Sequence, residues 1–113
     1  MATTHQDFML EDRIVRPLEG TITGPAGVER VQPKVMQVLV HLAGRAGQVV
    51  QRDELLEAVW QGAPMTDEVL NRCISELRRH LDDKPRTPKF LQTIPKVGYR
   101  LIGSVAPTPH SDD

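Results

Sequence analysis

Residues 93–101, TIPKVGYRL, place two cations in a segment that is expected to fold as a hairpin. Two extended pieces flank a four-residue tight turn, 95–98, which accounts for a proline and a glycine at these positions. Lys96 then lies near the tip of the hairpin, and Arg100 lies behind it. Because side chains alternate along a strand, Tyr99 is expected to pack beneath the hairpin rather than beside Arg100. The segment therefore presents positive charge on a short finger.

A second set of polar side chains lies on one face of a helix predicted over residues 66–81. An apolar stripe at helical spacing should face the core: Leu70, Ile74, Leu77 and Leu81. At about 100° per residue, the opposite face carries Glu68, Arg72, Ser75, Glu76 and Arg79. Thr66 is expected as the N-cap, with Asp67 and Glu68 in the first turn. The exposed face therefore combines hydrogen-bond donors with acceptors.

The composition is that of one small globular domain. The chain has 113 residues, of which 39% are apolar and 26% are charged. No apolar run approaches the ~20 residues that a membrane helix needs. The N-terminal segment, MATTHQDFMLED, lacks the basic and apolar regions of a secretion signal, and the single Cys73 cannot form an internal disulfide. These features predict a cytoplasmic location.

Charge is distributed unevenly along the chain. Residues 68–102 hold eight cations and four anions, a net charge of +4, whereas the remainder carries −5 and the whole chain −1. Such asymmetry indicates a surface for a charged ligand, or it is an ordinary fluctuation of charge along the sequence. Charge alone leaves both interpretations open.

The remaining elements follow from periodicity and turn residues. Four short extended pieces punctuated by proline and glycine predict an N-terminal four-stranded antiparallel sheet: Phe8 to Leu10, Ile14 to Arg16, Thr21 to Thr23 and Val28 to Val31. Pro33 opens a helix that is apolar nearly all round and should be central to the core. A second helix, RDELLEAVW, buries Leu55, Leu56, Val59 and Trp60. We expect a flexible N-terminus at 1–7, a domain at 8–102 and a flexible linker or tail at 103–113.

This order of elements predicts an α+β winged helix-turn-helix fold, with a four-stranded sheet, three helices and a C-terminal β-hairpin wing at 90–102. In such a layout the third helix, 66–81, fits the major groove of double-stranded DNA, which is about 12 Å wide. The wing then reaches the DNA backbone or the minor groove. Arg72 and Arg79 on the helix, with Lys96 and Arg100 on the wing, are candidate DNA contacts.

Two segments resemble the OmpR/PhoB-type winged-helix DNA-binding domain. They are residues 31–60, VQPKVMQVLVHLAGRAGQVVQRDELLEAVW, and residues 67–101, DEVLNRCISELRRHLDDKPRTPKFLQTIPKVGYRL. The chain looks most similar to the CadC- and ToxR-like regulators, which carry no phosphorylatable receiver domain. The resemblance implies a bacterial transcription regulator that reads double-stranded DNA. It also suggests a longer natural protein, whose tail would lead to a membrane span or a sensor domain.

The resemblance implies roles for individual residues. Arg72, Ser75 and Glu76 fall at positions that touch bases or adjacent phosphates, whereas Trp60, Arg78 and Thr93 fall at positions that contact phosphates. Glu76 stands where PhoB-like members have arginine, and it could accept from a cytosine amino group or pair with Arg72. Pro95 replaces an arginine of the wing, and Lys96 is the nearest substitute.

The resemblance also implies protein partners. The loop from Gln61 to Met65 would touch RNA polymerase, and two domains would bind direct repeats head-to-tail. A winged helix used only for protein–protein contact is the alternative function, and an apolar outward face on the third helix would favour it. No catalytic motif, metal-ligand spacing or cofactor motif is present, so we expect no enzyme, no metal, no cofactor and no small-molecule substrate. Cys73, which flanks the apolar stripe, is expected to be buried.

Overall fold

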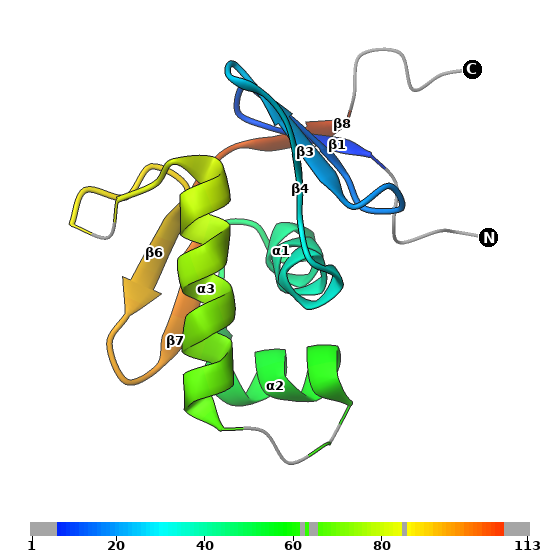
Figure 1. Ribbon diagram of the computed structural model, residues 1–113. Helices are drawn as coiled ribbons and strands as arrows, with labels where there is room; N and C mark the ends of the chain where they lie inside the picture. The colour runs from blue at the N-terminus through cyan, green and yellow to red at the C-terminus, as the bar shows by residue number, and fades with distance from the viewer. Residues whose placement is uncertain (1–6, 62, 64–65, 85, 108–113) are drawn as a thin grey trace.

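The computed structural model describes residues 7–61, 63, 66–84 and 86–107. Its elements follow the order of an N-terminal sheet, three helices and a C-terminal hairpin (Figure 1). The helices are α1 (Pro33–Gly44), α2 (Arg52–Trp60) and α3 (Asp67–Leu81). The strands are β1 (Phe8–Leu10), β2 (Arg13–Arg16), β3 (Thr21–Gly24), β4 (Gly27–Arg30), β5 (Val49–Gln51), β6 (Leu91–Ile94), β7 (Gly98–Leu101) and β8 (Val105–Pro107). This is the predicted winged helix-turn-helix, with two further short strands.

The N-terminal sheet contains the four predicted strands and a fifth from the C-terminal end. Its order is β4-β3-β2-β1-β8, with antiparallel neighbours throughout. The prediction of a flexible tail from residue 103 was wrong for β8, because Val105 pairs with Leu10 and Pro107 pairs with Phe8. A proline is tolerated there because β8 is an edge strand. The rest of the predicted tail, 108–113, and residues 1–6 of the predicted N-terminus lie outside the described residues.

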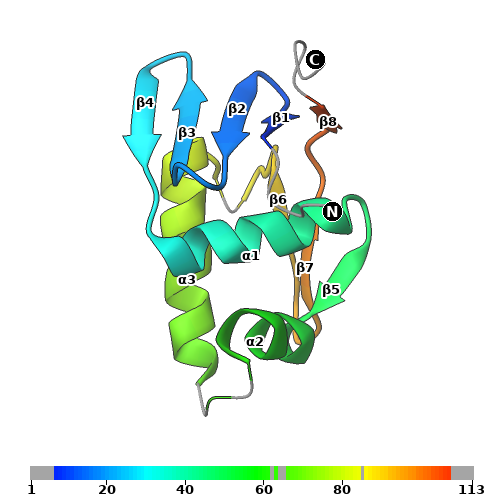
Figure 2. The same cartoon turned by 90° about the vertical axis from the view of Figure 1, so that its right-hand side faces the viewer.

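Helix α1 is the centre of the core, as predicted. It lies beneath the N-terminal sheet and above α2, with α3 crossing behind it in this view (Figure 2). Five of its side chains are buried: Val35, Met36, Val38, Leu39 and Leu42. Because the helix is covered on several sides, an apolar surface nearly all round is what its position requires.

The turn unit consists of α2 and α3. The predicted stripe of α3 is buried as expected, and Cys73 joins it. Thr66 occupies the N-cap with an extended backbone, although its side chain makes no capping hydrogen bond. On α2, Leu55 and Val59 are buried, whereas Trp60 is half-buried against the core. The Lys34 ammonium donates to the Val59 carbonyl at 2.9 Å, which ties the end of α2 to the start of α1.

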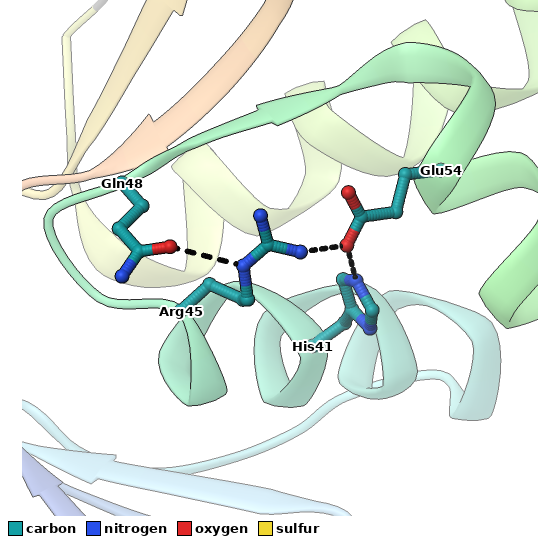
Figure 3. Close-up of polar contacts among 4 residues, drawn as sticks. All are labelled: His41, Arg45, Gln48 and Glu54. Carbon is teal, nitrogen blue, oxygen red and sulfur yellow. Dashed lines mark hydrogen bonds and ion pairs between the residues drawn. The ribbon is translucent and has the colours of Figure 1, made fainter.

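A polar cluster holds the other end of α1 to α2 (Figure 3). One carboxylate oxygen of Glu54 lies 2.8 Å from Nε2 of His41. The same oxygen accepts a hydrogen bond from Nη1 of Arg45. Arg45 Nε donates to the Gln48 side-chain oxygen at 3.2 Å. This bond connects the loop that leads to β5 with the same polar cluster. Glu54 is therefore the shared acceptor that fixes the start of α2 against α1.

The wing is part of a three-stranded sheet in the order β5-β7-β6. Its turn is closed by the Val97 N–H, which donates to the Ile94 carbonyl at 3.0 Å, and Lys96 takes the left-handed conformation with φ of +66°. Gly98 has no positive φ, so the turn alone does not require it. A Cβ at Gly98 would instead lie 2.0 Å from the Val50 carbonyl oxygen, and glycine lets β5 approach.

Replacement of Gly98 by alanine should lower the free energy of unfolding by about 3 kcal/mol, because backbone atoms of β5 must move to admit the Cβ. Gly44→Ala is the matched control, since a Cβ there meets nothing within 4 Å and the site ends a helix. Urea unfolding of both variants measures the difference. Equal stability of the two variants would contradict the close approach of β5 and β7.

Candidate nucleic-acid interface

Helix α3 and the wing lie side by side (Figure 1). Glu68, Arg72, Ser75 and Arg79 are exposed on α3, as the helical periodicity predicts. On the wing, Thr93 and Lys96 are exposed and Arg100 is half-buried. The structure therefore brings the predicted helix and hairpin residues onto neighbouring surfaces. A duplex placed along α3 would meet both.

The three candidate base-reading residues differ in exposure and in whether their side chains have partners within the protein. Arg72 and Ser75 are exposed, and neither has a side-chain hydrogen bond or ion pair among the described residues. Glu76 is half-buried, with an oxygen 3.5 Å from Nη2 of Arg79. The predicted alternative, a pair with Arg72, was wrong, because the partner lies three positions after Glu76 rather than four before it. Arg72 is thus the cation of this face that has no carboxylate partner within the described part of the chain.

Arg78 holds α3 against the wing. Its Nη2 donates to the Thr93 hydroxyl at 2.7 Å and to the Leu91 carbonyl at 3.2 Å. Its Nε is buried and has no partner among the described residues. Both predicted phosphate contacts, Arg78 and Thr93, are therefore bonded to one another. A phosphate contact by this pair can use the remaining N–H groups of the guanidinium or the hydroxyl proton of Thr93, because that hydroxyl only accepts from Arg78.

Asp83 makes a further connection between α3 and the wing, which the sequence did not predict. Asp82 ends α3 in the left-handed conformation, with φ of 56°. The buried carboxylate of Asp83 then accepts from the backbone N–H groups of Lys89 at 2.7 Å, Phe90 at 3.3 Å and Leu91 at 2.9 Å. A charged acceptor thereby fixes the position at which β6 begins.

A third connection joins the start of α3 to the opposite end of the wing, and it too was missed. Arg52 Nη1 donates to the Tyr99 hydroxyl at 3.1 Å, and Nη2 donates to Asn71 Oδ1 at 3.0 Å. The Tyr99 hydroxyl lies 3.1 Å from the same Asn71 oxygen and donates to it. Tyr99 is 3% exposed, which confirms that it packs beneath the wing. The three residues come from α2, α3 and β7, and no local sequence pattern connects them.

Trp60, Lys96 and Arg100 occupy positions that their predicted roles allow. Trp60 ends α2 with its ring 5.9 Å from the Lys34 ammonium. Lys96 is exposed at the tip of the wing, and the Nε of Arg100 is buried without a partner in the described part of the chain. Contact of these three residues with phosphates stays a prediction.

Residues 28–101 match the model of the family described as transcriptional regulatory protein, C terminal. The chain belongs to this family. It is 38% identical over 73 residues to the transcriptional activator CadC of Escherichia coli, covering 64% of this chain and 14% of CadC. It is 35% identical over 104 residues to the cholera toxin transcriptional activator of Vibrio cholerae, covering 87% of this chain and 35% of that protein. The chain therefore spans about a third or less of these relatives, and the predicted CadC-like resemblance is confirmed.

Solved structures agree with this family assignment. The DNA-binding domain of E. coli CadC superimposes with a TM-score of 0.80 at 31% identity, covering 90% of this chain and 96% of that domain. The DNA-binding domain of Klebsiella pneumoniae RstA, solved in complex with the RstA box, has a TM-score of 0.74 at 24% identity, covering 87% and 98%, and shares the fold. No helix in the described part of this family member is long and apolar enough to cross a membrane.

Helix α3 of this transcriptional regulatory domain carries a buried thiol, Cys73, on its inner side, in the hydrophobic core. Burial raises the pKa of Cys73 above its ordinary value, because the thiolate loses solvation, and the nearby charge of Glu76 raises it further. A raised pKa and low exposure both oppose reaction with oxidants. The sequence-based assignment of Cys73 as a buried apolar residue is confirmed.

Cys73 should react with a thiol reagent such as dithionitrobenzoate far more slowly in the native protein than in urea, because both its accessibility and its thiolate fraction are low. Raising the pH from 7 to 9 should accelerate the native reaction, since it increases the thiolate population of a group with a raised pKa. The measurement is the absorbance of released thionitrobenzoate. Equal rates in the native and unfolded protein would show that the inner side of α3 is open.

Proposed function

We propose that this chain binds double-stranded DNA sequence-specifically, as the DNA-binding domain of a bacterial transcription regulator. Helix α3 enters the major groove, and the wing contacts the backbone or the minor groove. The supporting observations are that α3 lies beside the wing (Figure 1) and that the polar side chains of α3 and the cation in the wing turn are exposed. Family membership and the likeness to the CadC DNA-binding domain point in the same direction.

Protein–protein contact is a weaker account of the same surface. The large apolar residues that are exposed in the described part of the chain are Leu18, Val28, Val97 and Ile102. None of them lies on α3, and Val97 alone is in the wing turn. A partner protein would more commonly find an apolar centre in its binding surface, whereas the exposed face of α3 offers charges and hydroxyls.

Three features of the proposal extend beyond the domain itself. RNA polymerase is the proposed partner of the loop that follows α2, although Gly62, Pro64 and Met65 of that loop lie outside the described residues. We also propose head-to-tail binding of two domains on direct repeats. The third feature is a cytoplasmic location for this domain, with a membrane anchor elsewhere in a longer protein. The domain carries no proposed cofactor or enzymatic activity.

Selection from a randomised duplex pool tests sequence-specific binding. The bound fraction is isolated at two salt concentrations and sequenced, and affinity is measured by fluorescence anisotropy. We expect an enriched motif, repeated at about one helical turn if two domains bind together. If about five phosphates are neutralised, the logarithm of affinity should fall against the logarithm of salt with a slope near −4 to −5. Salt-sensitive binding without a motif would leave only a non-specific binder, and no binding at low salt would refute the proposed function.

Arg72→Ala should lower affinity for the selected site by about 1–3 kcal/mol and blunt sequence preference, because its guanidinium is free to reach base edges. Lys96→Ala should weaken binding to selected and random duplexes about equally, because a lysine at the wing tip contacts phosphates. Both residues are exposed, so neither change should alter the melting temperature much. An equal loss on both duplexes for the Arg72 variant would show that it does not read bases.

A further inference from the structure

The hydrogen bonds around Asn71 determine which way its amide faces. A guanidinium can only donate, so the atom of Asn71 that lies 3.0 Å from Arg52 Nη2 must be the oxygen. The Tyr99 hydroxyl accepts from Arg52 Nη1 and uses its own proton to donate to the same oxygen. Both lone pairs of that oxygen are then occupied by protein donors. The amide nitrogen has no partner among the residues that the structure describes.

Asn71 lies at the edge of the proposed DNA-binding face that is nearest to the wing. The residue is exposed, and at about 100° per residue it is roughly 40° from Ser75 around the axis of α3. Its oxygen is directed toward Tyr99 in β7, which places the residue where the helix meets the wing. A duplex that contacts both Ser75 and the wing would pass over this position.

We propose that Asn71 is a further DNA contact and that it acts only as a hydrogen-bond donor. This inference rests on the proposed function. An asparagine that reads adenine needs its oxygen and its nitrogen at once, one to accept and one to donate. With the oxygen occupied by Arg52 and Tyr99, Asn71 can serve only an acceptor on the DNA, either a phosphate oxygen or an acceptor atom on a base edge. Arg52 and Tyr99 are positioning residues for this contact.

Asn71→Asp separates a DNA contact from a purely structural role. The carboxylate keeps one oxygen for Arg52 and Tyr99, and the contact with Arg52 becomes an ion pair. Its second oxygen replaces the N–H donors and would face the acceptor on the DNA with a negative charge. We expect an unchanged or higher melting temperature and an affinity for the selected duplex that is lower by about tenfold or more. Alanine is a less clean change, because it would release Arg52.

Thr66→Asp is the matched control for charge. Thr66 is exposed at the N-cap of the same helix, on the side roughly opposite the proposed face, and aspartate is favoured at an N-cap. It adds the same charge near the same end of α3 without replacing a donor on the face. An Asn71→Asp variant that binds as tightly as Thr66→Asp would overturn the inference while leaving the proposed function intact. A lower melting temperature for Asn71→Asp would overturn it as well, because Arg52 and Tyr99 would then not hold an oxygen of residue 71 as the inference requires.

The two possible acceptors are distinguished by comparing selected and random duplexes, with the wild-type protein measured in parallel. A similar loss of affinity on both duplexes assigns the acceptor to a phosphate, whereas a loss confined to the selected duplex assigns it to a base edge. Failure of the wild-type protein to bind either duplex would instead refute the proposed function itself. The variant measurements therefore test the contact of Asn71, and the wild-type measurement tests DNA binding itself.

Discussion

The buried carboxylate of Asp83 is the contact on which the relation between α3 and the wing depends. Three consecutive backbone N–H groups, from Lys89 to Leu91, converge on it just before β6 begins. Each of these donors would cost about 1–3 kcal/mol if it were left buried without an acceptor. One side chain that directly follows α3 therefore holds three N–H groups at the start of the wing.

The wing is held to α3 and α2 at further points along its length. Arg78 reaches β6 from the last turn of α3, and Arg52 joins Tyr99 in β7 to Asn71 near the start of α3. Gly98 adds a packing constraint, since it admits the backbone of β5 where a side chain would collide. Helix and wing are therefore joined at several points along their length. A protein that must touch two neighbouring parts of a duplex gains affinity from such pre-organisation, because little conformational freedom is lost on binding.

The sequence predicted those features that have a local pattern. The stripe on α3 follows the helical period, and the hairpin follows from a turn between two extended pieces, so both were found with nearly correct bounds. Strands β5 and β8 have three residues each and are strands only because β7 and β1 lie beside them. The role of Asp83 was not predicted, because its donors are separated from it by a loop. Gly98 illustrates a different limit, since a turn and a close contact both select glycine and the sequence does not distinguish them.

Net charge also bears on how such a surface discriminates among ligands. The chain as a whole carries −1, and the face of α3 combines Arg72 and Arg79 with Glu68 and Glu76. The Glu76–Arg79 pair neutralises part of that face internally. Attraction to phosphates that is independent of sequence grows with the number of free cations, so this internal pair reduces it on the α3 face. Discrimination must then come from a few groups in fixed orientation, which is the property that the contacts of Asp83, Arg78 and Arg52 supply.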